Sequence, residues 1–155
     1  IRNILIEMSY NGSKYHGYQV QKNALAITEV VQDVIEKILK KRENIIGCSR
    51  TDTGVHANSY FFNIKTESKI PCNKLIQVFN RALPDDIVFL SCKDVPLDFH
   101  SRYNCIGKEY IYKIYDTDLK NPFLSDLALY YPEKLDVDLL NKKAQVLVGK
   151  HDFIL

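Results

Sequence analysis

The spacing of the apolar residues changes several times along the first part of the chain, and the order of these changes constrains the fold more than any other feature. Between residues 26 and 41 the apolar positions recur every three or four residues, which predicts a helix with one buried face. A second helical spacing follows Pro71, and proline suits the first turn of a helix because its missing N–H has no partner there. Short runs rich in Ile, Val, Phe and Tyr predict strands at 2–9, 45–48, 60–64 and 87–90.

The predicted order is therefore strand, helix, strand, strand, helix, strand. This is the split β-α-β pattern of a ferredoxin-like (RRM-like) domain, in which an antiparallel sheet carries both helices on one face. We expect this α+β domain to occupy residues 1–97.

The rest of the chain, residues 98–155, has fewer regular elements. The alternation of apolar and polar residues over 103–115 predicts a long strand, and a shorter strand is expected at 127–131. A helix is predicted over 136–148, with Gly149 as its C-terminal cap. These elements are expected to begin a second α+β domain that is truncated where the sequence ends.

Composition excludes several classes of function without naming one. Lys and Arg number 21 against 19 Asp and Glu, and a net charge of +2 does not mark a nucleic-acid binder by itself. No apolar run is long enough to cross a bilayer, and the first residues become polar too soon for a signal peptide. Four cysteines without a CxxC pair indicate neither a zinc site nor a disulfide framework, so we expect reduced thiols in a cytoplasmic protein. These cysteines are Cys48, Cys72, Cys92 and Cys105.

The densest group of polar side chains lies between two predicted strands, in residues 48–57. Arg50, Asp52 and His56 fall within seven positions there. One interpretation is a plain Asp-Thr-Gly turn in which Asp52 bonds to nearby backbone N–H groups. The other is a functional loop held by a rigid fold. Aspartic proteases also carry an Asp-Thr-Gly triplet, but they need a second copy and a shared proton, whereas Arg50 would keep Asp52 ionised.

The nine residues from Ser49 to Ala57 are similar to the Gly-Arg-Thr-Asp-Ala-Gly-Val-His-Ala signature of the TruA family of tRNA pseudouridine synthases. Five further segments resemble the same family in the same order, at residues 10–21, 80–87, 99–102, 108–112 and 149–153. Ser49, Tyr18 and Thr53 replace a usual Gly, Trp and Ala of the family, and none of these departures touches Asp52. Family members also extend well past the length of this sequence.

The resemblance implies an isomerase that converts uridine to pseudouridine in the anticodon stem-loop of tRNA. It assigns the catalytic carboxylate to Asp52, in the loop of the first domain, and implies an incomplete second domain of the pseudouridine synthase fold. The reaction exchanges a C1′–N1 bond for a C1′–C5 bond without oxidation, so we expect no cofactor and no metal. Glycosidases use carboxylates at the same sugar carbon. The family also implies a cytoplasmic homodimer, and the 155-residue chain alone is expected to lack part of the cleft.

The target nucleotide has to leave the base stack to reach a carboxylate, which costs a few kcal/mol. By resemblance Tyr110 stacks on the uracil. Arg50 lies two residues from Asp52, so in an extended segment both side chains share a face, and Arg50 is expected to pair with Asp52 or to bind a phosphate. Without the resemblance, Tyr110 would be an ordinary core aromatic. Further candidates for RNA contacts are His56, Tyr18, Gln19, Lys14, Lys22, Arg102, Lys108 and Lys113.

Two other classes of function are alternatives to the synthase. A catalytically idle RRM-like module would bind single-stranded RNA through exposed aromatics, but the sequence lacks the aromatic motif that such modules carry on a central strand. A metal-dependent nuclease would need several carboxylates converging on one site, and only Asp52 stands out.

Overall fold

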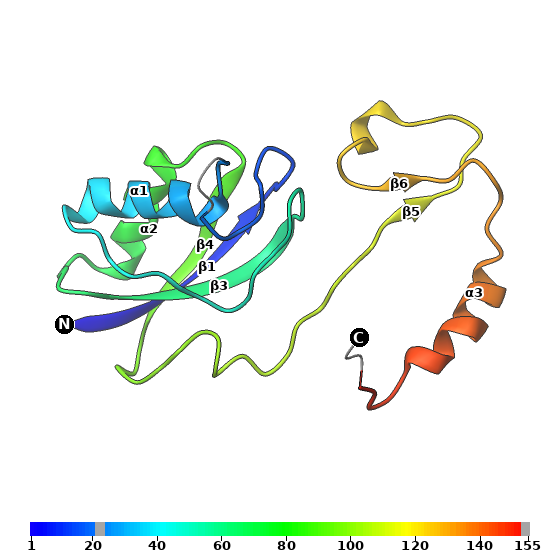
Figure 1. The fold of residues 1–155 in the computed structure, drawn as a ribbon. Coiled ribbons are helices and arrows are strands. Elements are labelled where there is room, and N and C mark those ends of the chain that lie inside the picture. Colours follow the sequence, from blue (N-terminus) through cyan, green and yellow to red (C-terminus); the bar gives the residue numbers. More distant parts are fainter. Residues whose placement is uncertain (21–23, 153–155) are drawn as a thin grey trace. The chain divides into compact units, whose positions relative to one another are not determined.

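A computed structural model describes residues 1–20 and 24–152 of the chain (Figure 1). Its internal contacts divide the chain into two compact units, Ile1–Lys108 and Glu109–Leu155. Lys22, a candidate RNA contact, and Phe153, part of the last segment of family resemblance, lie outside the described residues. No helix within the described ranges is both long and apolar enough to span a membrane.

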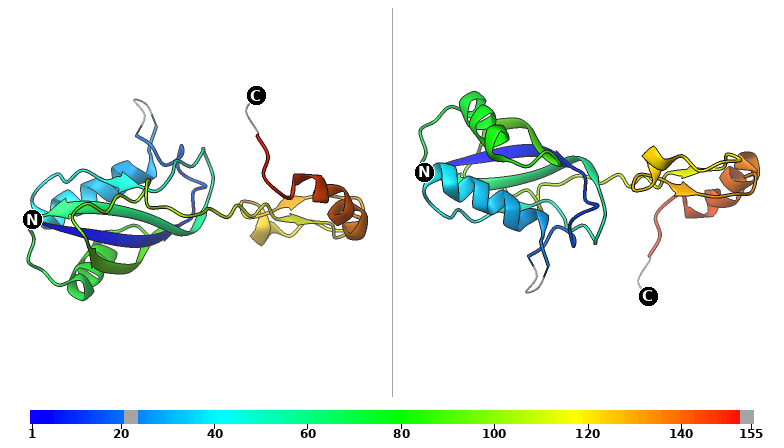
Figure 2. Two further views of the ribbon diagram at one scale, coloured as in Figure 1. Left: turned by 90° about the horizontal axis from the view of Figure 1, so that it is seen from below. Right: turned by 90° about the horizontal axis from the view of Figure 1, so that it is seen from above.

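The first unit combines a four-stranded sheet with two helices. Its elements are β1 (Arg2–Tyr10), α1 (Ile27–Leu39), β2 (Ile46–Gly47), β3 (Ala57–Thr66), α2 (Cys72–Ala82) and β4 (Ile87–Val95). The strands lie in the order β2-β3-β1-β4, and every neighbouring pair is antiparallel. Both helices cover the same face of the sheet (Figures 1 and 2). The expected mixture of an antiparallel sheet and helices is therefore present.

The core of this unit lies between the sheet and the two helices. The spacing of three and four residues along α1 places one of its faces against the sheet, as a helix with a single apolar stripe requires. Two edge-to-face contacts, each with ring centroids 5.5 Å apart, join Phe89 of β4 to Phe62 of β3 and Phe79 of α2. Buried side chains of β1 and the helices are Ile4, Ile6, Met8, Ile27, Val31, Val34, Ile35, Leu75 and Phe79.

The residues after β4 remain attached to the first sheet. Asn63 of β3 is fully buried, and its Oδ1 accepts the backbone N–H of Ser101 at 2.9 Å and the Ser101 hydroxyl at 2.8 Å. Asn63 Nδ2 donates to Asn3 Oδ1 at 2.9 Å, while Asn3 Nδ2 donates to the carbonyls of Pro96 and Phe99 at 2.9 and 3.0 Å. These buried amides hold residues 96–101 on the sheet, so the compact unit continues beyond the expected boundary at residue 97.

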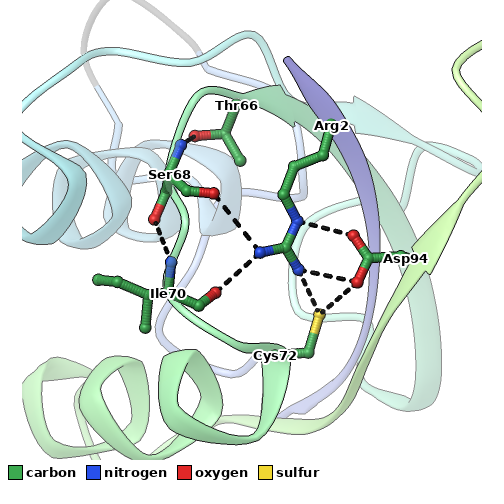
Figure 3. A network of polar contacts seen from close by, with 6 residues as sticks. All are labelled: Arg2, Thr66, Ser68, Ile70, Cys72 and Asp94. Atoms are coloured by element: carbon green, nitrogen blue, oxygen red, sulfur yellow. Dashed lines mark hydrogen bonds and ion pairs between the residues drawn. The ribbon is translucent and has the colours of Figure 1, made fainter.

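A second polar network closes one end of the helix–sheet layer (Figure 3). The guanidinium of Arg2 on β1 binds Asp94 of β4 through two nitrogens, at 2.7 and 2.9 Å. It also donates to the carbonyl of Ile70 at 2.8 Å and to Cys72 Sγ at 3.1 Å. Arg2 thereby joins β1 and the edge strand β4 to the segment that leads into α2.

The second unit has short elements, and two of the predictions for this part are wrong. It contains β5 (Ile114–Tyr115) and β6 (Leu129–Tyr130), which pair in parallel, the 3-10 turns Pro122–Leu124 and Gln145–Leu147, and α3 (Val137–Ala144). The long strand predicted over 103–115 is reduced to its last two residues, because only these find a backbone partner. The helix predicted over 136–148 ends at Ala144, and the 3-10 turn that follows makes Gln145 its cap in place of Gly149.

Candidate active site

The polar loop between β2 and β3 packs against the loop that follows β1. The two loops are joined through their backbones: Tyr18 N–H donates to Thr51 O at 3.0 Å, and Gly54 N–H donates to Tyr15 O at 3.2 Å. Within the polar loop, Val55 N–H donates to Asp52 O at 3.2 Å and closes a tight turn. Asp52 therefore sits on a turn whose place is set by a segment more than thirty residues earlier in the chain.

Two glycines allow this close approach. A Cβ atom at Gly12 would lie 2.0 Å from the carbonyl oxygen of Val55, which no side chain can tolerate. A Cβ atom at Gly17 would lie 2.6 Å from the carbonyl oxygen of Thr51, and Gly17 has a φ of +83°, a region that favours glycine. Any side chain at these two positions would clash with the Asp52 loop, and this requirement for glycine is not visible in the sequence alone.

Side chains add three further links to the loops. His56 Nδ1 accepts the backbone N–H of Gly12 at 2.9 Å, so His56 orders the loop. The Tyr10 hydroxyl and Thr51 Oγ1 are 2.9 Å apart, and burial raises the pKa of Tyr10 to about 12. The Tyr15 hydroxyl donates to Asp86 Oδ1 at 2.7 Å.

An open pocket of about 460 Å³ lies over the joined loops. Its lining residues are His16, Gln19, Arg50, Thr51, Asp52 and Thr53. The side chains of Asp52 and Arg50 are exposed, and neither forms an ion pair or side-chain hydrogen bond within residues 1–20 and 24–152. A carboxylate and a guanidinium are thus presented together to an incoming group, since they do not neutralise each other.

The structure brings three of the predicted site residues together in this pocket: Asp52, Arg50 and Gln19. His16 lines it as well, although the only signal for it in the sequence is its place in the 10–21 segment, immediately before Gly17. No group of three His, Cys, Asp or Glu side chains that could hold a metal ion occurs in the described part of the chain.

Tyr18 is not placed as expected. Its side chain is 7% exposed, and its ring packs on that of Tyr60 with centroids 4.6 Å apart. The buried ring does not support the predicted RNA contact of Tyr18, because the ring belongs to the core beneath the loops. Burial accordingly raises the pKa of the Tyr18 hydroxyl.

The remaining candidates are on the surface. Lys14 lines a separate pocket of about 500 Å³, and its Nζ is 3.9 Å from Asp86 Oδ2. Arg102 and Lys108 are exposed in the first unit. Tyr110 and Lys113 belong to the second unit, where both are exposed.

Comparisons with known proteins agree on one family. A family model described as tRNA pseudouridine synthase matches residues 7–104. The tRNA pseudouridine synthase A of Thermoanaerobacter sp. (strain X514) is 42% identical over 153 residues, covering 99% of this chain and 63% of the relative. The protein of the same name from Staphylococcus aureus (strain MRSA252) is 40% identical over 150 residues, covering 97% and 57%. The chain thus spans less than two thirds of the length of these relatives.

Proposed function

Because the chain belongs to the tRNA pseudouridine synthase family, we propose that its protein isomerises uridine to pseudouridine in tRNA, with Asp52 as the catalytic carboxylate. The observation that carries the proposal is the exposed Asp52 side chain, which lies in a pocket with Arg50 and Gln19 and has no ionic partner among the described residues. A carboxylate without a partner is free to meet a developing positive charge on a substrate.

The chemistry requires little more than a positioned carboxylate. The C1′–N1 bond breaks, the uracil turns, C5 joins C1′, the C5 proton leaves, and N1 takes up a proton. C1′ becomes electron-poor as the first bond breaks, and a carboxylate beside it stabilises that state or attacks it, as in glycosidases. The open pocket around Asp52 suits a nucleotide that has left the base stack.

Arg50 is proposed to bind a phosphate next to the everted nucleotide. Its guanidinium lines the Asp52 pocket and has no carboxylate partner in the described ranges, so its donors remain available for a bidentate contact with phosphate. Gln19 is proposed to contact the same nucleotide from the opposite loop. Tyr110 is proposed to stack on the uracil, and its exposed ring in the second unit is compatible with this role.

Several wider features are proposed from the strand order and from the family. The strand order β2-β3-β1-β4 with two helices on one face supports a ferredoxin-like class for the first unit. Residues after this unit would begin a second domain of the pseudouridine synthase fold. We further propose the anticodon stem-loop as the target, a homodimer as the active form, and a cytoplasmic location.

The test of the function is the Asp52→Asn variant of the full-length protein. The substrate is tRNA whose uridines carry tritium at C5, because tritium leaves when the new carbon–carbon bond forms. We expect tRNA binding within about twofold of the wild type and at least about a thousandfold loss of tritium release. Wild-type release by the variant would remove Asp52 from the mechanism. Binding without any release by the wild type would instead favour an RNA-binding module.

A further inference from the structure

Asp86, in the turn that leads into β4, is bonded to the loop that supports the Asp52 turn. Its carboxylate Oδ1 accepts the Tyr15 hydroxyl at 2.7 Å, and its backbone oxygen accepts the N–H of Asn11 at 2.9 Å. The Asp86 side chain is 19% exposed and Tyr15 is 4% exposed, so the contact between them is largely shielded from water. A hydrogen bond to a carboxylate in such a place is stronger than a neutral one.

Tyr15 is also one of the residues that hold the Asp52 turn. Its backbone N–H donates to Gly12 O at 2.9 Å, and its backbone oxygen accepts the N–H of Gly54 at 3.2 Å. Gly54 has a φ of +77°, and no neighbouring atom lies within 4 Å of the place its Cβ would take. The hydrogen bond from the Gly54 N–H to the Tyr15 carbonyl is therefore one of the links that hold the turn, together with the contact at Gly12 and the bond from Tyr18 to Thr51.

We propose that Asp86 is a positioning residue for the catalytic loop, acting through Tyr15 to fix the orientation of Asp52. The proposal rests on the proposed function for its catalytic consequence, but the physical link is independent of it. The path runs from the Asp86 carboxylate to the Tyr15 hydroxyl, and from the Tyr15 carbonyl to the turn that bears Asp52.

The chemistry of the pair suits a fixed link. Burial, and then the hydrogen bond to Asp86, raise the pKa of Tyr15, so the hydroxyl stays protonated and remains a donor throughout the neutral range. The other carboxylate oxygen of Asp86 faces Lys14 Nζ at 3.9 Å, an exposed contact that contributes little. The tyrosine hydroxyl is thus the main partner of the carboxylate side chain.

The decisive variant is Tyr15→Phe in the full-length protein, because it removes one oxygen atom and leaves the buried ring. We expect kcat for tritium release to fall about tenfold to a hundredfold, as small misplacements of a catalytic group do, while KM for tRNA stays within about twofold. Hydrogen exchange at the backbone amides of residues 52–55 should become faster in the same variant.

Asp86 variants separate positioning from general stability. Asp86→Asn keeps an oxygen acceptor for the tyrosine and should retain most of the wild-type kcat. Asp86→Leu removes the acceptor, and its kcat should fall as much as that of Tyr15→Phe. The double variant Tyr15→Phe/Asp86→Leu should lose no more than either single change, because both break the same link. The matched control is Asp33→Asn, which disturbs only an exposed contact between Asp33 and Arg42 at 3.5 Å.

Each result decides the proposal. Unchanged kcat and unchanged exchange in Tyr15→Phe would overturn it, and so would a loss that appears only in KM or equally in the Asp33→Asn control. If even the wild type releases no tritium, the proposed function fails, and faster exchange at residues 52–55 in Tyr15→Phe alone then still supports the link.

Discussion

At the scale of single residues, the position of Asp52 depends on two glycines, whose missing Cβ atoms allow two loops to touch. Gly12 and Gly17 let the loop after β1 lie directly against the carbonyl groups of the Asp52 loop. The Tyr10 hydroxyl and the His56 imidazole then bond across the same contact. The carboxylate itself makes no such bond within residues 1–20 and 24–152, so its orientation depends entirely on the backbone that carries it.

Gly17→Ala should disturb this contact. The new methyl group would meet Thr51 O at 2.6 Å in a backbone conformation that alanine disfavours, so we expect a loss of about 1–3 kcal/mol in the free energy of unfolding. Tritium release should fall by at least about tenfold, because the backbone that bears Asp52 has to move. Urea unfolding and the tritium assay measure the two effects.

Gly107→Ala provides the control for that change. No atom lies within 4 Å of a Cβ at Gly107, and its φ is not in the left-handed region. We expect stability and activity to match the wild type. Equal losses in the two variants would show that the close approach at Gly17 is not the cause.

Tyr10 predicts a dependence of stability on alkaline pH. Its pKa is raised to about 12 in the folded protein, against about 10 in an unfolded chain. Between these values the folded state keeps a proton that the unfolded chain releases, so the stabilisation is complete below about pH 10 and is lost as the pH rises to about 12. Two pKa units correspond to on the order of 2–3 kcal/mol.

Tyr10→Phe removes this contribution, so its unfolding free energy should fall less steeply than that of the wild type above about pH 10. Urea unfolding at about pH 8 and at about pH 11 measures the difference. Identical slopes for the two proteins would contradict the role of Tyr10. Tyr15, Tyr18 and Tyr60 have raised pKa values for the same reason of burial, so some slope should remain in the variant.

At the scale of elements, the buried amides under the sheet explain why the chain after β4 does not separate from the first unit. The side-chain nitrogen of Asn63 donates to Asn3, and its side-chain oxygen accepts two hydrogen bonds from Ser101. Buried amides in such a network are stabilising only while every partner is present.

Asn63→Leu should therefore release residues 96–101 from the sheet. The Asn3 amide and the Ser101 N–H would lose a partner in a buried place, which costs about 1–3 kcal/mol for each group that water does not reach. Hydrogen exchange at the Ser101 amide should become faster. The control is Asn58→Leu on the same strand, where the side chain is exposed and no comparable loss is expected.

Elements set by local spacing were predictable, and elements set by distant partners were not. α1 was expected over 26–41 and spans Ile27–Leu39, because one apolar stripe decides both its existence and its packing. β3 begins three residues earlier than expected, at Ala57, because pairing with β1 extends it through polar residues. The strand expected over 103–115 had the alternation but not the partner.

The site also combines features that local sequence predicts with features that depend on distant partners. The dense polar loop predicts Asp52 and Arg50 as site residues, because charged groups are not needed to make a turn. The burial of Tyr18 and the inclusion of His16 could not be read from the sequence, since both depend on how the two loops pack. The catalytic role of Asp52 stays a prediction until the tritium assay is made.

At the scale of the whole molecule, the two units differ in how much they bury. The first contains a continuous cluster of buried aliphatic and aromatic side chains. In the second, none of the described residues is buried, and α3 has no buried position. Burial of apolar surface is the main favourable term in folding, so the two units should differ in their capacity to fold alone.

Residues 1–108 expressed alone should unfold cooperatively, with a midpoint close to that of the 155-residue chain. Residues 109–155 alone should show no cooperative transition, because their described residues enclose no core. Circular dichroism on heating distinguishes the two. A sharp transition in residues 109–155, or none in residues 1–108, would contradict the expectation that only the first unit folds by itself.

The close contact at Gly12 and Gly17 also limits what the nine residues 49–57 can do by themselves. Transplanted into an unrelated hairpin, they would deliver the acid and the guanidinium but no surface to hold their turn, and catalysis should not follow them. Genome searches for this chemistry would gain accuracy by demanding both segments: the nonapeptide, and upstream of it a pair of glycines five positions apart.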